Sequence, residues 1–469
     1  NYLITAGSYT TAATADFSTL TFDSTGGAIN FALTSGHTLN SSNNGKAMLF
    51  SGSSDINLTG GHSTTTGVSA LWFHNYLDAS ATLNLGVNWG NSVHMLVGGT
   101  GFTNYTGTGL GMSSGSDLVV DGGVFRVAAD QNMAGYVGAA RINDAVFEIG
   151  ADLNGVTAGD FSGNIANFRL TGNAGLSAYT AVDGGVRDVG FTTDLTWGSN
   201  NFLTNASDNT DGDYALLLSS VRSNATINLT TNINLNGRHR TVDVANGSAA
   251  VDARLSGNLT GGLSSGLTKA GTGTLSLTGT NTYQGGTRVD AGKLIVGGGG
   301  INATTSLHVR NSSVEIAASG VINDAAAVTL ENGIMIANGG GVSETMGALT
   351  IIGDNQLNLI GVGNAIRFAD SSAQVWSSTL AILDWSGLSL GGGPDQVYFG
   401  TNASGITGSQ LSKISFLNPT LDGQSYTGTF GAAILSTGEI VAVVPEPSLA
   451  ALAFAGAGAA LFRRRRRNG

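Results

Sequence analysis

Cysteine is absent from the 469-residue chain, and proline occurs only four times, never before Pro394. The absence of cysteine excludes disulfides and thiolate metal sites. Charged residues make up 11% of the sequence, whereas an ordinary globular domain contains roughly 25%. Lysine stands at only four positions. These absences agree with a protein that is held together by long β-ladders.

Glycine, by contrast, accounts for 72 residues, about twice its usual share. Hydrophobic residues make up 41%, enough to bury a large core, so disorder is not expected. The formal net charge is −11, and without the last five arginines 15 basic residues stand against 31 acidic ones, a balance of −16. So acidic a body has no electrostatic reason to bind nucleic acid or anionic lipid, and we expect no nucleic-acid partner.

Short stretches of alternating apolar and polar residues recur along the chain. Examples are Ala225–Asn236, Thr274–Thr278, Ser313–Ala317 and Gln356–Ile360, each with Gly, Asn or Asp close by. This period of two predicts short β-strands separated by tight turns. Before Pro445 no stretch sustains the pattern of an amphipathic helix. The body is therefore predicted to be all-β.

Two architectures suit many short strands, a series of sandwiches and a parallel β-solenoid. More than 440 residues without a linker-like break, together with recurring Asn and Thr for side-chain ladders and Gly for corners, favour the solenoid. We therefore predict a right-handed parallel β-helix followed by a single C-terminal hydrophobic helix. At roughly 20–25 residues per turn it would have on the order of 18–22 turns.

The C-terminal segment 445–469 has three distinct parts. Pro445, Glu446 and Pro447 come first, and because proline has no backbone N–H to donate, neither strand nor helix pairing runs comfortably through them. The apolar run Leu449–Phe462 follows. As a helix it would span about 21 Å, somewhat short of a bilayer core of about 30 Å. The final part is a basic cluster that should stay on the cytoplasmic side of a membrane, namely Arg463, Arg464, Arg465, Arg466 and Arg467.

This order of parts closely resembles the PEP-CTERM sorting signal of Gram-negative bacteria. The resemblance implies that an exosortase, a membrane transpeptidase-like enzyme, cleaves near Pro445–Pro447. It also implies an exported protein, anchored in the inner membrane as a precursor and later found at the cell surface or outside the cell. Such a tag presupposes an N-terminal export signal, so we interpret Asn1 as the start of a mature or truncated product.

A second motif lies in the middle of the chain. Residues Gly266–Val296 read G-L-T-K-A-G-T-G-T-L-S-L-T-G-T-N-T-Y-Q-G-G-T-R-V-D-A-G-K-L-I-V. They resemble the autotransporter-associated β-strand repeat, also called the passenger-associated transport repeat, of large bacterial surface proteins. The residues that carry the resemblance are Gly266, Lys269, Gly273, Leu275, Leu277, Asn281, Tyr283, Gly285, Gly286, Val289, Gly292 and Leu294.

Each part of the repeat has an expected place in one turn of the solenoid and its continuation. Leu275 and Leu277 should point inward, Asn281–Gly286 should form a corner, and Val289, Leu294 and Ile295 should return to the core. Tyr283 should cap the corner by packing on the neighbouring turn. The chain then divides into a solenoid body at 1–265, the repeat at 266–296, more solenoid at 297–444 and the sorting signal at 445–469.

Catalytic and metal-binding patterns are weak. G-x-S-x-G occurs three times, at Gly111–Gly115, Gly262–Gly266 and Gly387–Gly391, but never on a recognisable strand-to-helix elbow. The six histidines are scattered, without a metal-ligand spacing. The densest acidic cluster is a weak calcium candidate without the EF-hand order, and a solvated turn explains it better; it consists of Asp208, Asp211 and Asp213. We expect no cofactor.

The preferred function is that of a non-enzymatic structural or adhesive protein of the cell surface or extracellular matrix, with exopolysaccharide or other matrix components as further partners. The first alternative is a carbohydrate-binding surface module, in which Trp72, Trp89, Trp376 or Trp385 would stack on sugars; core positions explain these residues better. The second is a β-helix polysaccharide hydrolase or lyase. Glycosidic cleavage needs two carboxylates at a defined separation, and the sequence does not identify such a pair.

Overall fold

The computed structural model describes residues 2–11, 15–16, 19–40, 46–63, 69–89, 93–107, 117–127, 139–150, 168–180, 184–199, 202–205, 207 and 210–444. The whole predicted sorting signal, residues 445–469, lies outside these ranges. Within them, no helix combines the length and the hydropathy that crossing a membrane requires.

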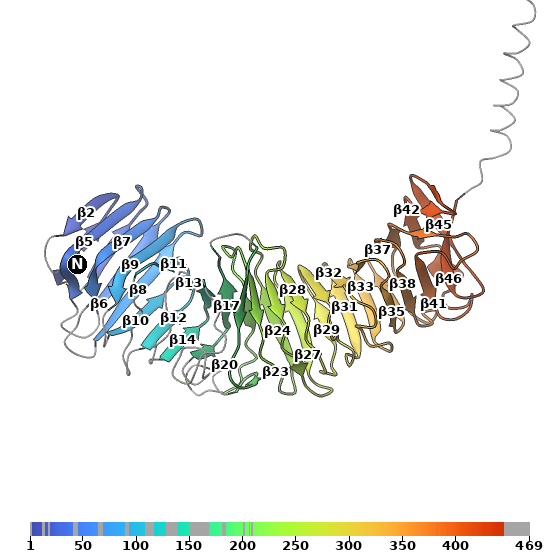
Figure 1. The fold of residues 1–469 in the computed structure, drawn as a ribbon, viewed down its shortest axis with the longest axis horizontal. Coiled ribbons are helices and arrows are strands. Elements are labelled where there is room, and N and C mark those ends of the chain that lie inside the picture. The colour runs from blue at the N-terminus through green and yellow to red at the C-terminus, as the bar shows by residue number, and fades with distance from the viewer. Residues whose placement is uncertain are drawn as a thin grey trace, which may run out of the picture.

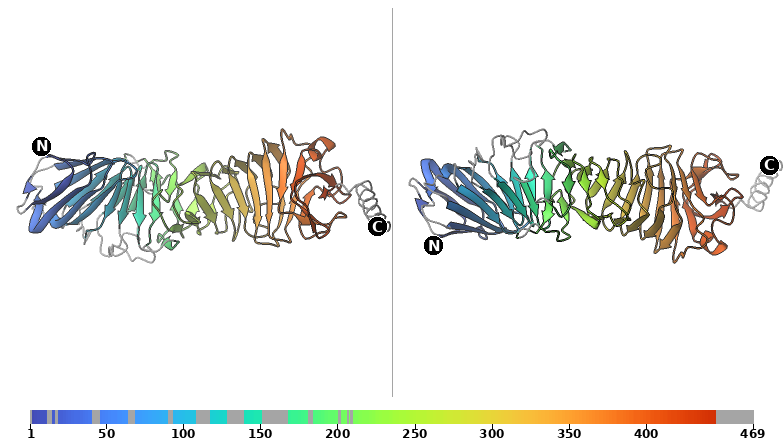
Figure 2. Two further views of the ribbon diagram at one scale, coloured as in Figure 1. Left: turned by 90° about the horizontal axis from the view of Figure 1, so that it is seen from above. Right: turned by 90° about the horizontal axis from the view of Figure 1, so that it is seen from below.

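The described residues form an elongated rod of stacked strands (Figure 1). The first strands of the chain lie at one end and the last strands at the other, and views from above and below show the same progression (Figure 2). Nearly all strand pairs are parallel, and each strand pairs with strands of the preceding and following turns. The prediction of an all-β parallel solenoid is confirmed.

One sheet, which we call the long sheet, runs along most of the rod and has 16 strands. Its path is β2 (Gly7–Thr11), β5 (Ile29–Asn40), β7 (Ile56–Ser63), β9 (Thr82–Trp89), β11 (Phe102–Tyr105), β13 (Val124–Val127), β15 (Val146–Ile149), β17 (Ala174–Ala178), β21 (Leu216–Leu218), β24 (His239–Val244), β27 (Gly266–Ala270), β29 (Thr287–Val289), β31 (Ser306–Arg310), β33 (Ala327–Glu331) and β36 (Leu349–Ile352), with β3 (Ala15–Asp16) paired to β5.

Two further sheets lie beside the long sheet, one in the N-terminal part of the rod and one in its C-terminal part. The N-terminal sheet contains β1 (Tyr2–Ile4), β4 (Thr19–Asp23), β6 (Lys46–Gly52), β8 (Ser69–Leu77), β10 (Val93–Gly98), β12 (Asp117–Asp121), β14 (Ala139–Asn143), β16 (Phe168–Thr171) and β20 (Phe202–Thr204). The C-terminal sheet contains, in order, β18 (Val186–Val189), β22 (Thr226–Leu229), β25 (Ala253–Leu255), β28 (Thr274–Leu277), β30 (Lys293–Val296), β32 (Ser313–Ile316), β34 (Ile334–Asn338), β37 (Asn355–Ile360), β39 (Leu380–Leu383), β42 (Ile414–Leu417), β45 (Thr429–Ile434), β46 (Glu439–Val443), β41 (Gln396–Phe399), β38 (Ala365–Phe368) and β35 (Ser343–Met346).

Short elements complete the turns. One three-stranded sheet contains β19 (Leu195–Thr196), β23 (Ile233–Asn234) and β26 (Leu259–Thr260). A second contains β40 (Ser386–Gly387), β43 (Thr420–Leu421) and β44 (Gln424–Ser425). The helix α1 (Gly408–Leu411) begins with a capping box, in which the side chains of Thr407 and Gln410 each accept the other's backbone N–H.

The length of a turn varies along the rod. Leu267 pairs with Thr287 and Ile29 pairs with Ile56, so a turn near the middle of the rod is shorter than one near its N-terminal end. Ala174 pairs with Leu216, which makes the connection from β17 to β21 longer than either. Because several connections are long, the described chain makes fewer turns than the 18–22 that were expected at about 20–25 residues per turn.

The interior is filled by apolar side chains that repeat from turn to turn. Parallel strands place paired residues directly above one another, about 4.8 Å apart. Phe22 and Phe50 are paired in this way, with ring centroids 5.0 Å apart, and the ring of Phe73, two positions out of register with Phe50, lies 6.2 Å from that of Phe50. In later turns the rings of Tyr105 and Phe125, which are also out of register with each other, lie 6.2 Å apart. Each ring thus removes its neighbours from water, and aromatic pairs of this kind add about 0.5–1.5 kcal/mol beyond their buried area.

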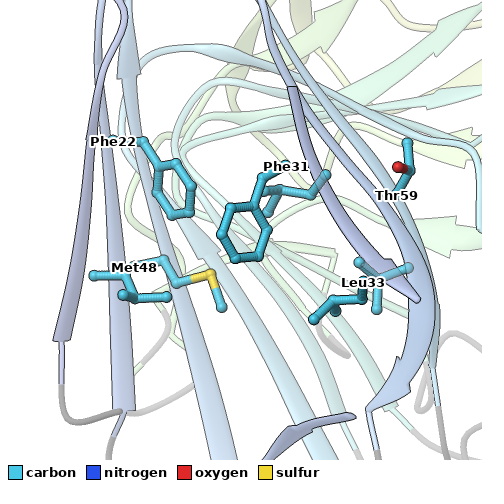
Figure 3. A pocket seen from close by; sticks show the side chains of 8 residues that line it. Phe22, Phe31, Leu33, Met48 and Thr59 are labelled. Atoms are coloured by element: carbon cyan, nitrogen blue, oxygen red, sulfur yellow. The ribbon is translucent and has the colours of Figure 1, made fainter. Parts of the chain in front are cut away.

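A small pocket lies among the first turns, inside this core (Figure 3). It is lined by Leu20, Phe22, Phe31, Leu33, Met48, Leu58, Thr59 and Val87. Thr59 is the one polar residue of this lining, and none of the eight is ionisable. The pocket is an apolar packing gap, and we assign no chemistry to it.

Asparagines form a ladder on the long sheet. The amide of Asn57 donates to Asn30, that of Asn84 to Asn57 and that of Asn104 to Asn84, at 2.8, 2.8 and 2.9 Å. Each amide can donate and accept at once, so identical residues in register satisfy one another. The recurring asparagines that favoured a solenoid in the sequence play this part.

The C-terminal end of the rod is closed by an antiparallel hairpin. β45 pairs with β42, and β46 pairs with both β45 and β41, in each case antiparallel. β42 and β41 belong to two separate parallel runs of strands. The hairpin therefore joins these runs and covers their open edges, which would otherwise offer unpaired backbone groups to another chain.

Inward and outward positions on one strand provide a direct test of this arrangement. Leu359 and Ile360 are neighbours on β37, but Leu359 is fully buried and Ile360 is 39% exposed. Leu359→Asp should lower the unfolding temperature strongly, because an unpaired buried carboxylate costs several kcal/mol. Ile360→Asp, the matched control, should change it by at most a few degrees. Equal effects in thermal melts followed by circular dichroism would contradict the assigned faces.

Candidate functional site

The repeat segment Gly266–Val296 forms two successive turns near the middle of the rod. β27 and β28 belong to the first turn, and β29 and β30 to the second. β27 pairs with β29 and β28 pairs with β30, both parallel. The motif thus stacks on itself, and its second half repeats the positions of its first.

The predicted core residues of the repeat are confirmed with one exception. Leu275, Leu277, Val289 and Leu294 are all fully buried. Ile295 is only half-buried, so its predicted place in the core is wrong. Strand alternation explains the error, since in β30 the residues on either side of Ile295 point inward.

Two glycines of the motif stack on one another at a corner. Gly292 has a φ of +64°, and a Cβ added there would lie 2.3 Å from the carbonyl oxygen of Gly273. A Cβ on Gly273 would lie 2.5 Å from the carbonyl oxygen of Ala245, one turn earlier. The corners of three turns are therefore in backbone contact, and only glycine fits between them.

The other glycines lie at the ends of the same strands. Gly266 begins β27. Gly285 and Gly286 end the corner Asn281–Gly286, where the amide of Gly285 donates to the carbonyl of Ser265 (2.7 Å) and the carbonyl of Gly286 accepts from Leu267 (3.0 Å). This corner is confirmed as predicted.

Lys269 has the most unusual surroundings in the repeat. Its side chain is fully buried, and Nζ donates to the carbonyl oxygens of Ala270 (2.8 Å), Gly271 (2.6 Å) and Ala291 (3.0 Å). Ala291 belongs to the following turn, so the ammonium group joins two corners. Burial lowers the pKa of Lys269 to about 8, while Asp243 and Asp252 act in the opposite direction.

Asn281 connects three turns. Its Oδ1 accepts from the amide of Leu259 in the preceding turn (3.0 Å), and its Nδ2 donates to the carbonyls of Gly279 (3.0 Å) and of Gly300 in the following turn (2.9 Å). The residue is almost fully buried. It satisfies backbone groups that the strand ladders leave unpaired at the corner.

Tyr283 lies in the core, whereas the sequence had placed it as a cap over the corner. The ring is 1% exposed, and its hydroxyl bonds Thr287 (2.7 Å). Thr287 in turn bonds Thr304 of the next turn (3.1 Å), whose hydroxyl donates to the carbonyl of Gly285 (2.8 Å). Burial raises the pKa of Tyr283 far above its usual range, so the ring stays neutral.

In the weak calcium candidate, the described carboxylates bond arginine side chains. Asp208 lies outside the described residues, but Asp211 and Asp213 both bond the buried guanidinium of Arg240, at 2.6 and 3.1 Å. Arg238 bonds Asp213 at 2.6 Å. The hydrogen bond from Arg240 lowers the pKa of Asp211. Two cations therefore neutralise the two described carboxylates, and in the described part of the chain no cluster of three metal-ligating side chains exists.

Two of the four tryptophans considered for sugar stacking are in the core. Trp376 and Trp385 are 5% and 1% exposed, whereas Trp72 is 38% exposed. The side chain of Trp89 lies outside the described residues, as do Pro445–Pro447 and Arg463–Arg467. Only Trp72 therefore remains as a described tryptophan that a ligand could reach.

A buried polar cluster was missed by the sequence analysis. Glu148 is fully buried and bonds Arg126, Ser177 (2.7 Å) and Ser220 (2.7 Å). Arg126 also stacks on the ring of Tyr179, 3.9 Å from its centroid. The alternation in β15 predicts an outward-facing Glu148. Nothing local shows that the chain around Ser220, 72 residues later, covers it.

The comparisons with known proteins agree with this geometry, a parallel β-helix with a self-stacking two-turn motif near its middle. Residues 267–296 match the family described as Passenger-associated-transport-repeat. This repeat indicates an exported, autotransporter-like passenger with a β-helix. No curated protein and no solved structure matches the chain.

The buried lysine leads to a prediction about pH. Because the folded pKa of Lys269 is about 8 and its ordinary value is 10.5, the unfolded chain binds more protons between these values. The free energy of unfolding of the parent should therefore rise, relative to that of Lys269→Met, as the pH increases from 8 to 10.5. Urea denaturation at several pH values would measure the difference. Lys293→Met, on a side chain 37% exposed, controls for the loss of one positive charge, and parallel curves for parent and Lys269→Met would contradict the assignment.

The arginine pair predicts unequal effects from equal substitutions. Arg240 is 1% exposed and Arg238 is 51% exposed, although both bond the same two aspartates. Arg240→Ala should lower the free energy of unfolding by about 1.5–3 kcal/mol, because it removes the charge-assisted hydrogen bonds that this buried guanidinium donates to Asp211 and to the carbonyl of Leu235. Arg238→Ala should lower it by about 0–1 kcal/mol. If urea denaturation gave similar losses of unfolding free energy for the two variants, the buried guanidinium of Arg240 would not be what holds the segments of Asp211 and Arg240 together.

Proposed function

We propose that the chain is a non-enzymatic structural or adhesive protein of the cell surface or extracellular matrix, sorted and processed through its C-terminal tag. The observation that carries this proposal is the transport repeat at 267–296 inside a continuous parallel rod. A rod of stacked turns offers a long outer surface while its interior is filled by side chains, which suits a spacer or an adhesive stalk.

The way the rod uses its acidic groups supports a structural role. Asp252 accepts from the amides of Gly247 (2.7 Å) and Thr274 (2.8 Å). Glu344 accepts from Val321 (2.9 Å) and Ile322 (3.0 Å), and burial raises its pKa. Both carboxylates are engaged by backbone amides, and most of these amides belong to neighbouring turns. A glycoside hydrolase instead needs two carboxylates facing a substrate across about 5–9.5 Å.

The processing part of the proposal rests on the tail sequence. The rod ends with β46 at Val443, and Pro445, Glu446 and Pro447 follow at once. An extended backbone that cannot join a strand is what a processing enzyme requires, and the two prolines supply it. Cleavage there by an exosortase-type enzyme releases the rod from Leu449–Phe462 and Arg463–Arg467, which would hold the precursor in the inner membrane.

This account predicts where the mature protein ends. Mass spectrometry of the surface fraction should find a C-terminal peptide that ends close to Val444. Replacing Pro445, Glu446 and Pro447 by alanine should block cleavage and leave the rod in the membrane fraction. The matched control replaces the two prolines of the rod, Pro394 and Pro419, and should leave processing unchanged. Recovery of intact Arg463–Arg467 from the surface fraction would overturn the processing proposal.

A further inference from the structure

Aromatic side chains gather on the outer face of β8. Trp72 and Tyr76 are 38% and 52% exposed, and His74 between them is half-buried. The three residues alternate with buried ones along the strand, so all three point to the same side. The rings of Trp72 and His74 are nearly parallel, with centroids 5.8 Å apart and planes 12° apart. We call these three residues the β8 platform.

The exposure of Trp72 is exceptional within the part of the chain that the structure describes. Trp197, Trp376 and Trp385 are 0%, 5% and 1% exposed. The core of this rod thus accommodates large rings readily, and β8 itself places Phe73 inside. A tryptophan, a histidine and a tyrosine on one outer strand face have no such packing role, and clustered exposed apolar groups mark interaction sites.

The neighbouring strand β6 places one apolar and one polar residue beside the platform. Leu49 of β6 pairs with His74 and is 39% exposed. Ser51 of β6 pairs with Tyr76, and Asp23 of β4 pairs with Ser51. The carboxylate of Asp23 is held in place, because Oδ1 accepts from the amide (3.0 Å) and the hydroxyl (2.6 Å) of Thr25. The hydroxyl of Ser51 therefore stands beside Tyr76 in register, and the oriented carboxylate of Asp23 stands one strand further away.

We propose that the β8 platform binds a neutral polysaccharide. A pyranose ring presents a flat C–H face that stacks on an aromatic ring and a rim of hydroxyl groups that donate and accept hydrogen bonds. Trp72 and Tyr76 supply the stacking surfaces, and Ser51 and Asp23 supply the polar rim. This inference names a ligand class for the adhesive role proposed above and rests on that role for its biological setting.

The charges near the platform select neutral chains over acidic ones. The residues that pair with Trp72 and His74 on both sides are uncharged, namely Ala47, Leu49, Leu96 and Gly98. The charged groups next in register are Asp121, which pairs with Gly98, and Asp23, whose hydrogen bonds to Thr25 lower its pKa. An anionic polysaccharide would be repelled by this negative charge. A neutral sugar can instead donate a hydroxyl to it.

Affinity gel electrophoresis of the full chain tests the proposal. Gels containing hydroxyethyl cellulose, dextran, xylan or mannan probe neutral polysaccharides, and alginate probes an acidic one. At least one neutral gel should retard the parent, and Trp72→Ala should weaken binding by about tenfold, the effect of losing one aromatic contact. Tyr9→Ala is the matched control, because Tyr9 is also 38% exposed but lies on β2 of the long sheet. Circular dichroism confirms that each variant is folded.

Fluorescence gives a second, site-specific result. The difference in emission between the parent and Trp72→Phe isolates Trp72, and the retarding polysaccharide should protect this component from acrylamide. The proposal is overturned if no neutral gel retards the parent, if Trp72→Ala and Tyr9→Ala behave alike, or if alginate alone retards the chain. Self-association that Trp72→Ala abolishes would assign the platform to a second copy of the chain instead. None of these outcomes bears on cleavage near Val444, so the processing proposal stands or falls separately.

Discussion

Each turn of this rod obtains the hydrogen-bond partners of its backbone from the turns before and after it. Along the strands the parallel ladders provide these partners, but at the corners the ladders stop and buried amides still need acceptors. Side chains meet that need. Asp252, Asn281, Glu344 and Asp395 are all nearly fully buried, and each accepts from backbone amides of another turn. A chain with few charged residues thus places several of them inside.

Lysine and arginine complete this scheme from the opposite side. Lys269 donates to three corner carbonyls, and Arg240 donates to the carbonyl of Leu235 (3.0 Å) as well as to two aspartates. A buried charge is costly unless it is paired or fully hydrogen-bonded. Lys269 is hydrogen-bonded through its ammonium group, and Arg240 is paired with aspartates. Each of them connects segments from different turns of the rod. These buried cations therefore join one turn of the rod to another.

The fold could be predicted because its signal is local. A period of two repeats over hundreds of residues, and the inward positions of Leu275, Leu277 and Leu294 follow from it directly. Ile295 was misplaced because two adjacent apolar residues leave the phase of a strand open, and only the pairing of β30 with β28 and β32 decides it. Glu148 and the arginines at Asp211 depend on contacts between segments 72 and 29 residues apart, for which alternation gives no information. The tail at 445–469 stays a prediction.

The hairpin at the C-terminal end has a mechanical consequence. β46 is the last strand before the chain leaves the rod, and it is hydrogen-bonded on both sides, to β45 and to β41. A pull applied beyond Val444 along this strand must shear two rows of hydrogen bonds together and cannot break them one at a time. The load then passes into two separate runs of parallel strands, since β42 and β41 lead into different faces of the rod. The same hairpin that ends the stack is built to transmit force into it.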